Sequence, residues 1–370
     1  LVQGYKEGGI LPKWPLASSY TGCMVGYPAV SVLADLVAKD LAEGDMSTWA
    51  EAGARSSVYR EDLAEKFKGT RELDLITMHP YYKEKYGFVP ADSVPESVSW
   101  GLEMAYEDWC ISQIAKKAGN MELANEYAKK AEYYKRYLDP ETKMMRPVMG
   151  DGSFRTPFNP RYSSHMKSDY TEGNAFQWSF FAPHDMDNFI AAIGGKKELE
   201  TRLDTLFTTS SQIDGAEASG DITGLIGQYA HGNEPSHHMA YLYNWTDSPW
   251  KGQGYLDYIM QNFYTNEPDG IIGNEDCGQM SAWYVMSALG FYQVSPGIPV
   301  YTLGRPMVNK ASMHVKGGIF EIVATNNNPA NKYVKEVKLN GKVLETPFIS
   351  HSDIINGGKL EFIMTDQPVK

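Results

Sequence analysis

The pattern of apolar and polar residues divides the chain into two parts. Up to about Gly297, apolar residues recur at three- and four-residue steps between polar, glycine- and proline-rich loops, which predicts a series of helices. From about Val300 onward, apolar and polar residues alternate, which predicts β-strands. The clearest expected helices are residues 96–118, 121–138, 185–193, 198–207, 236–245, 254–263 and 279–289. The clearest expected strands are residues 313–316, 319–324, 334–339 and 360–364.

This order of elements predicts a mainly α-helical fold that ends in a small antiparallel β module. Consecutive helices joined as hairpins indicate a solenoid or a closed toroid, and the absence of a fixed repeat of about 34 to 45 residues favours the toroid. An (α/α)6 toroid has more helices than the pattern shows, so we expect it to be incomplete at its N-terminus. We expect the helical domain to span residues 1–298 and the β module residues 299–370, with Asn340-Gly341 as a hairpin turn.

Composition narrows the classes of function. The formal net charge of -12 disfavours a polyanionic partner such as nucleic acid. No apolar run approaches the roughly 18 residues that span a bilayer. Aromatic residues are frequent at 12%; such rings stack on the C–H faces of sugars, and they also fill helical cores.

Three polar tracts that contain glycine stand where expected helices begin, at residues 170–178, 231–244 and 273–283. Each contains a carboxylate and an amide side chain, which is more than a helix cap requires. We therefore expect the three tracts to share one pocket.

Two of these tracts contain carboxylates with alternative roles. Glu172 is either a general acid, with a pKa raised by apolar surroundings, or a residue that complements the dipole of the next helix. Asp276, two residues after Asn274, is either the cap of helix 279–289, completed by Gln279 as a capping box, or a carboxylate that activates water.

The middle tract combines amide, carboxylate and imidazole groups. The oxygens of Asn233 and Glu234 suit a hard cation such as Ca²⁺, and the zinc-protease signature H-E-x-x-H is absent. The spacing of His237, Tyr241 and Asn244 predicts one face of helix 236–245. The alternative is a polar network that packs helices together.

Two tryptophans and one aspartate are further candidates for substrate contacts. Trp14 is either a stacking platform for a sugar or a core residue, and Trp178 lies in the aromatic helix after Glu172. Asp108 lies within helix 96–118, where a carboxylate that faces the interior needs a partner or a function. The segment Pro183-His184-Asp185 is typical of a helix cap.

Further motifs follow one another along the chain in a fixed order. They are Glu7-Gly-Gly-Ile-Leu-Pro-Lys-Trp-Pro15, Cys23-Met-Val-Gly-Tyr27, Glu96-Ser-Val-Ser99, Glu107-Asp-Trp-Cys110, Asp151-Gly-Ser-Phe-Arg-Thr-Pro-Phe158 and Leu289-Gly-Phe-Tyr292. With the three tracts, they resemble glycoside hydrolase family 92, the calcium-dependent, exo-acting α-mannosidases common in gut Bacteroidetes. The resemblance implies an (α/α)6 toroid, preceded upstream of Leu1 by a β-sandwich domain that contributes to the cleft and is absent from this chain.

The resemblance also implies roles for the candidate residues in an inverting hydrolysis. Glu172 corresponds to the acid and Asp276 to the base, and Asn274 is a further catalytic candidate, because some family members carry Asp at its position. Ca²⁺ held by Asn233 and Glu234 binds sugar hydroxyls. The expected substrate contacts are Trp14, Asp108, Trp178, His231, Glu234 and His237, with His231 at the leaving sugar.

The sequence therefore predicts an exo-acting α-mannosidase for terminal α-mannosides of N-glycans or mannan, with α-1,2 linkages foremost. The resemblance implies a periplasmic, cell-surface or secreted location. Two alternatives remain at this point. A non-catalytic carbohydrate-binding paralogue would lack carboxylates, whereas both are present, and a metal-independent (α/α)6 glycoside hydrolase would not depend on calcium.

Overall fold

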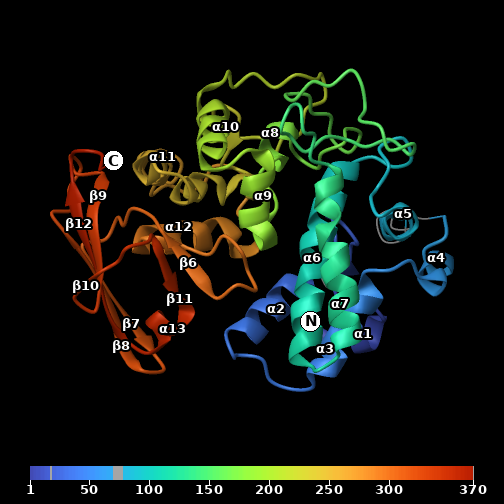
Figure 1. Cartoon of the computed structure of the whole chain (residues 1–370), viewed down its shortest axis with the longest axis horizontal. Coiled ribbons are helices and arrows are strands. Elements are labelled where there is room, and N and C mark those ends of the chain that lie inside the picture. Colours follow the sequence, from blue (N-terminus) through green and yellow to red (C-terminus); the bar gives the residue numbers. More distant parts are fainter. Residues whose placement is uncertain (17–18, 70–77, 370) are drawn as a thin grey trace. The chain divides into compact units, whose positions relative to one another are not determined.

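A computed structural model describes residues 1–16, 19–69 and 78–369 (Figure 1). These residues form two compact units, which are described separately. The first unit comprises Leu1–Met186, Ile213–Ser219 and Pro296–Ile298. The second unit comprises Asp187–Gln212, Gly220–Ser295 and Pro299–Lys370.

The first unit is built mainly from helices. Its α-helices are α1 (Val2–Gly8), α2 (Ala29–Ala38), α3 (Met46–Ser56), α4 (Glu61–Lys66), α5 (His79–Tyr86), α6 (Ser97–Lys117), α7 (Met121–Lys130) and α8 (Ala175–Trp178). Its other elements are the 3-10 helices η2 (Ala131–Arg136) and η3 (Pro183–Asp185) and the short strands β1 (Pro15–Leu16) and β2 (Ser19–Tyr20). Helices α6 and α7 lie side by side as a hairpin (Figure 1).

Helix α6 is the centre of the first unit and confirms the helix predicted over residues 96–118. Its side chains are buried on nearly every face, because helices α2, α3 and α7 all pack against it. Gly101 is required there, since a Cβ at this position would lie 1.9 Å from the hydroxyl of Tyr137. The helix predicted over residues 121–138 is α7 followed by η2.

The second unit contains helices and most of the strands. Its helices are α9 (Met186–Ile193, whose first residue belongs to the first unit), α10 (Lys196–Thr208), η4 (Glu234–Ser236), η5 (Met239–Trp245), α11 (Pro249–Asn262), η6 (Asp276–Gly278), α12 (Gln279–Leu289) and α13 (His351–Ile355). Its strands are β3 (Leu225–Ile226), β4 (Tyr229–Ala230), β5 (Phe291–Tyr292), β6 (Val300–Leu303), β7 (Lys310–Val315), β8 (Gly318–Thr325), β9 (Tyr333–Leu339), β10 (Lys342–Val343), β11 (Phe348–Ser350) and β12 (Gly358–Thr365).

The C-terminal strands form a five-stranded sheet in the order β10-β9-β12-β8-β7 (Figure 1). Buried residues alternate along β8 and β12, as the period of two predicts. The predicted hairpin turn is confirmed: Leu339 pairs with Lys342, and Asn340 and Gly341 have φ values of 50° and 80°. The expectation of an antiparallel module holds except for one pair, because β8 and β12 run parallel.

One predicted helix has a different form. Residues 236–245 were expected to form an α-helix, whereas the chain forms two 3-10 helices, η4 and η5. In a 3-10 helix, side chains three residues apart share a face, as Tyr241 and Asn244 do in η5, but His237 lies outside both helices, so the three residues do not form one helix face. Tyr241 donates to the Ser287 hydroxyl, while Asn244 donates to the carbonyl of Leu303.

The described residues are therefore mainly helical up to α12 and mainly sheet after it, as the sequence predicted. The closure of the helices into an (α/α)6 toroid and the domain boundary after residue 298 stay predictions. In the described part of the chain, no helix is both long enough and apolar enough to cross a membrane.

Candidate active site

The predicted site residues occur in both units. Trp14, Asp108, Glu172 and Trp178 belong to the first unit, and His231, Asn233, Glu234, His237, Asn274 and Asp276 belong to the second.

Glu172 lies in a turn that its neighbours fix on both sides. The backbone N–H of Thr171 donates to the hydroxyl of Ser99 on α6 at 2.8 Å, and the indole of Trp178 donates to the Thr171 carbonyl at 2.8 Å. Glu172 itself is half-buried and has a φ of 46°. A non-glycine residue held in the left-handed region is strained, and such residues cluster at functional sites.

The helix after this turn does not use Glu172 as its cap. Asn174 caps α8: its side chain accepts from the N–H of Phe176 at 3.0 Å, and its own N–H donates to the Gln177 side chain at 2.7 Å. Glu172 lies two residues before this cap, and the first turn of α8 contains no acidic residue. The dipole role that the sequence left open for Glu172 is therefore wrong, and the acid role remains.

The two tryptophans of the first unit differ in exposure. Trp14 is 36% exposed, so the core alternative is wrong, and its role as a stacking platform stays a prediction. Trp178 is 2% exposed and packs beneath the Glu172 turn. As placed, Trp178 positions this turn, and a contact between Trp178 and substrate stays a prediction.

Asp108 has a structural partner for its buried carboxylate. Both of its oxygens lie 3.0 Å from the ammonium of Lys83, and the hydroxyl of Tyr27 also donates to it. Burial raises the pKa of Asp108 and lowers the pKa of Lys83, and each charge opposes the shift of the other. The ion pair accounts for Asp108 without a substrate, so its predicted substrate contact stays untested.

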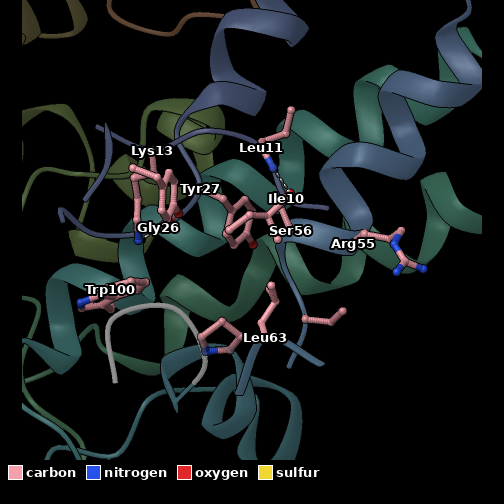
Figure 2. A pocket seen from close by; sticks show the side chains of 12 residues that line it. Ile10, Leu11, Lys13, Gly26, Tyr27, Arg55, Ser56, Leu63 and Trp100 are labelled. Atoms are coloured by element: carbon pink, nitrogen blue, oxygen red, sulfur yellow. Dashed lines mark hydrogen bonds between the residues drawn. The ribbon is translucent and has the colours of Figure 1, made fainter. Parts of the chain in front are cut away.

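A pocket in the first unit adjoins Lys13, the residue before Trp14. Figure 2 shows Lys13, Gly26, Tyr27 and Trp100 among the twelve residues that line it. The Lys13 ammonium donates to the Gly26 carbonyl at 3.1 Å and lies 4.4 Å from the centre of the Trp100 ring. Burial lowers the pKa of Lys13 to about 7. Sequence reasoning missed this lysine, and its position between two prolines in an apolar segment was the available signal.

In the second unit, two Gly-Asn-Glu segments cross at their glycines. A Cβ on Gly273 would lie 2.3 Å from the carbonyl oxygen of Gly232, so only glycine permits this approach. The crossing brings the residues after each glycine, Asn233 and Asn274, into neighbouring turns. The amide of Asn274 donates to a carboxylate oxygen of Asp221 at 3.2 Å. The second and third polar tracts therefore meet as predicted.

His231 lies wholly buried beneath this crossing. Its two ring nitrogens lie 2.8 Å and 2.7 Å from the hydroxyls of Tyr229 and Tyr264, and its ring stands edge-on to Trp283 at 4.4 Å. Burial lowers the pKa of His231 well below its ordinary value. His231 is therefore a neutral residue that positions the tract, and its expected contact with a leaving sugar stays a prediction.

His237 connects the second tract to helix α12. One ring nitrogen lies 3.0 Å from the His231 carbonyl, the other lies 3.3 Å from the side-chain amide of Gln279, and Trp283 donates to the His237 carbonyl at 2.9 Å. Burial lowers the pKa of His237 to about 4. These contacts confirm the polar packing network that the sequence offered as the alternative for this residue.

Asp276 lies in a strained turn at the start of α12. Its φ is 51°, and Gly278 follows at 110°. The predicted capping box does not form: Gly278 is the N-cap, and Glu275 instead accepts from the backbone N–H of Ser281 at 3.1 Å. Over residues 1–16, 19–69 and 78–369, the Asp276 carboxylate has no hydrogen-bond or ion-pair partner. It is half-buried and available to a water or a substrate.

Asn233 and Glu234 supply oxygen atoms of the kind that Ca²⁺ prefers. Asn233 is buried, and the charge of Glu234 raises the pKa of Tyr264 and Tyr292 in addition to the larger effect of burial. Among the described residues, no three His, Cys, Asp or Glu side chains form a group that could hold a metal. Ca²⁺ usually takes about six to eight oxygen ligands. A Ca²⁺ ion at these two residues would therefore take most of its ligands from backbone carbonyls, water and sugar hydroxyls, and the calcium site stays a prediction.

Sequence comparisons place the whole chain with one kind of protein. Residues 1–366 match the family model for the glycosyl hydrolase family 92 catalytic domain. A fungal relative, an uncharacterized secreted glycosidase from Arthroderma benhamiae, is 23% identical over 98% of this chain and 48% of its own length.

Two solved structures are similar throughout. A family GH92 α-mannosidase from Bacteroides thetaiotaomicron in complex with mannoimidazole has a TM-score of 0.88 and 39% identity, over 100% of this chain and 47% of that one. A family GH92 inverting mannosidase from Bacteroides thetaiotaomicron VPI-5482 has a TM-score of 0.84 and 32% identity, over 99% of this chain and 49% of that one. The chain thus spans about half the length of these relatives.

Proposed function

This chain belongs to glycosyl hydrolase family 92, and we propose that it supplies the catalytic carboxylates of an exo-acting α-mannosidase that inverts the anomeric configuration. One observation carries the proposal. Glu172 and Asp276 each occupy a strained, half-buried turn, and neither caps the helix that follows it. Residues held in such backbone conformations cluster at functional sites.

Glu172 acts as the general acid in this proposal. Its protonated carboxyl donates to the glycosidic oxygen as the bond to C1 breaks, so that the leaving sugar departs as a neutral alcohol. The Asn174 cap and the Trp178–Thr171 hydrogen bond keep the turn rigid during proton transfer. The related structure with mannoimidazole supports mannose as the bound sugar.

Asp276 acts as the general base. Its ionised carboxylate takes a proton from a water that attacks C1 on the opposite face, which yields β-mannose from an α-mannoside. Inversion requires the two carboxyl groups to lie roughly 6.5–9.5 Å apart in the working enzyme, so that a water fits. The amide of Asn274 is held by Asp221 and shares no proton transfer. The relative named as an inverting mannosidase supports this stereochemistry.

Asn233 and Glu234 would hold Ca²⁺ at the sugar. When bound, the ion would coordinate sugar hydroxyls and would favour the flattened ring of an oxocarbenium-like transition state. Asn233 and Glu234 contribute side-chain oxygens as metal ligands, on a turn that the Gly232–Gly273 crossing keeps fixed. His231 and His237 stay neutral beneath that turn and orient it.

The proposal extends to substrate and location. We place terminal α-1,2-mannosides of N-glycans or mannan first, with Trp14 as a stacking face, in a helical (α/α)6 toroid with an upstream β-sandwich as its partner domain. The location proposed is the periplasm, the cell surface or the medium. The fungal relative described as secreted supports a location outside the cytoplasm.

The test is an assay of the full-length protein on α-1,2-mannobiose, with Ca²⁺ and then with excess EDTA, while NMR follows the product anomers. We expect β-mannose first, and only with Ca²⁺. Release of α-mannose would overturn inversion, and activity that ignores EDTA would overturn the calcium role and favour a metal-independent hydrolase. Absence of release across all mannobiose linkages would favour a non-catalytic paralogue.

A further inference from the structure

The second unit contains a hollow that the proposed chemistry does not use. It lies where α11 meets the start of β9, and it has a volume of ≈ 350 Å³, within the range of roughly 300–1,000 Å³ typical of ligand sites. The hydrogen bond from the backbone of Val334 to the Gln253 side chain, at 2.9 Å, joins β9 to α11. The lining residues are Ile226, Trp250, Lys251, Gly254, Tyr255, Tyr258, Lys332 and Tyr333.

Four aromatic rings line this hollow. Trp250 and Tyr258 are eight residues apart on α11 and share one face, at a spacing along the helix of about 12 Å. Tyr258 is 49% exposed, and the Trp250 ring stands edge-on to Tyr333 at 6.3 Å. Tyr255 is held by stacking on Phe207 at 3.9 Å. Rigid rings spread over this length offer apolar faces to an extended ligand at little cost in conformational entropy.

Gly254 lies on the same helix face, midway between Trp250 and Tyr258. Glycine within a helix is destabilising relative to alanine, so its presence needs a reason. For Gly252 the reason is packing, since a Cβ there would lie 2.3 Å from the Ala240 carbonyl oxygen. At Gly254 a Cβ would meet only Tyr333, at an ordinary 3.8 Å. Packing does not demand this glycine, and the absence of a side chain leaves the floor between the two rings open.

The charges at the hollow do not suit an anion. The Lys251 ammonium lies 2.7 Å from a Glu200 carboxylate oxygen and 2.5 Å from one of Asp204, so its charge is compensated. Lys332 is exposed beside Tyr333. The two lysines offer N–H donors, and the charges of Lys251, Lys332, Glu200 and Asp204 together are close to zero. Aromatic faces with a few donors are the features that recognise the C–H faces and hydroxyls of neutral sugars.

We propose that this hollow is a second, non-catalytic carbohydrate-binding site, which holds a neutral oligosaccharide chain across Trp250 and Tyr258. A ligand at this site would raise the local concentration of chain ends near the enzyme. That the chain is a mannan rests on the proposed function, whereas the sugar-binding character of the hollow does not.

The test is retardation of the full-length protein in native gels that contain yeast mannan, in an Asp276→Asn background to stop hydrolysis. Trp250→Ala removes a ring, and Gly254→Leu fills the floor while it raises helix propensity; thermal unfolding of each variant shows that lost binding is not caused by unfolding. Gly254→Ala is the matched control, because it adds one methyl where there is room. We expect the first two changes to weaken binding about tenfold and the control to retain it.

Equal retardation of the parent, Trp250→Ala and Gly254→Leu proteins would overturn the site. The same result is expected if another protein segment covers the hollow, and it overturns the site in that case too. With Asp276 intact, Trp250→Ala should leave turnover of a small aryl α-mannoside within about twofold of the parent, since the proposed catalytic groups are unchanged. Loss of that turnover would likewise contradict a separate site. A parent protein inactive on every mannoside that still shows variant-sensitive retardation would overturn the proposed function alone.

Discussion

Two buried polar clusters, one in each unit, are stabilised in contrasting ways. In the first unit, Lys83 and Asp108 are removed from water as an ion pair at 3.0 Å. In the second unit, the buried groups beneath the Gly232–Gly273 crossing are neutral, and His231 and His237 bond to tyrosine hydroxyls, an amide and a carbonyl. The stability that a buried charge contributes depends on the presence of its partner. The stability that a neutral histidine network contributes depends on the histidines remaining unprotonated.

The difference is visible at the two proposed catalytic turns. Side-chain and backbone hydrogen bonds of Thr171 and Asn174 fix the residues around Glu172, next to the ion-paired helix α6. Close backbone contact between glycines supports the turn before Asp276. We therefore expect charge changes to be most damaging at the Lys83–Asp108 pair, and changes in pH or at Gly273 to be most damaging at the crossing.

The largest loss of stability is expected from breaking the buried ion pair. Asp108→Asn leaves the Lys83 ammonium buried without its counter-charge, and we expect the free energy of unfolding to fall by about 3–5 kcal/mol. Chemical denaturation measures this change. Asp40→Asn is the matched control, since the Asp40–Lys117 pair in the same unit is exposed and should contribute less than about 1 kcal/mol. Equal losses from the two variants would contradict the account.

The next effect is a dependence of stability on pH in the second unit. His237 has an ordinary pKa of 6.5 in the unfolded chain and about 4 when folded, so between these values only the unfolded state takes up the proton. Stability from this group is therefore complete above pH 6.5 and is lost as the pH falls towards 4, by up to about 3 kcal/mol.

The measurement is the free energy of unfolding from pH 7 to pH 4 for the parent and for His237→Gln. The variant should show a shallower decline, because its amide does not titrate. The same change at His314, which is exposed on β7, is the control and should leave the decline unchanged. A decline that is equally steep in His237→Gln would contradict the assignment.

The glycine crossing should show a smaller and separable effect. Gly273→Ala places a Cβ 2.3 Å from the Gly232 carbonyl oxygen at a φ of 79°, whereas Gly278→Ala meets nothing at a φ of 110°. Both variants carry the strain of positive φ, of the order of 1–3 kcal/mol, and the first adds a clash. We expect Gly273→Ala to be the less stable in thermal unfolding. Equal melting temperatures would show that the crossing tolerates movement.

The smallest effect on stability is expected at the adjacent carboxylates of Glu275 and Asp276, and it distinguishes the two. Glu275→Gln weakens the bond to the Ser281 N–H, and we expect a small loss of stability because this hydrogen bond is exposed. Asp276→Asn should cost no stability, because the Asp276 carboxylate has no partner among residues 1–16, 19–69 and 78–369. Thermal unfolding of the two variants measures the difference. A clear loss from Asp276→Asn would give the carboxylate a structural role.

Much of the fold could be predicted from periodicity. Helix α6 and strands β8, β9 and β12 appear within a few residues of their predicted ranges, because each has one strong apolar pattern. Residues 236–245 were mistaken for an α-helix because their aromatic side chains are buried on every side, which leaves no polar face to set the period. The parallel β8–β12 pair depends on contacts far apart in sequence, which a local pattern does not contain.

The candidate site could be predicted in part. The polar tracts identified the turns of Glu172 and Asp276, since Gly, Asn and Glu in a short loop are visible as composition. Asp276 was expected as the cap of helix 279–289, whereas Gly278 is the N-cap and Glu275 accepts from the N–H of Ser281. Several residues of this tract were suitable caps, and composition alone does not choose among them. Lys13 was missed, since its burial depends on contacts with Gly26 and Trp100 that periodicity does not show.

The most direct test of the division of labour between Glu172 and Asp276 compares two substrates. In the full-length protein, Glu172→Gln and Asp276→Asn are each assayed on α-1,2-mannobiose and on 2,4-dinitrophenyl α-mannoside, whose leaving group needs no proton. We expect Glu172→Gln to lose about 10²–10⁴-fold in kcat/KM on the disaccharide and far less on the aryl mannoside, and Asp276→Asn to lose similar amounts on both. Equal losses of Glu172→Gln on the two substrates, or an Asp276→Asn protein that remains active, would contradict the assignment of acid and base.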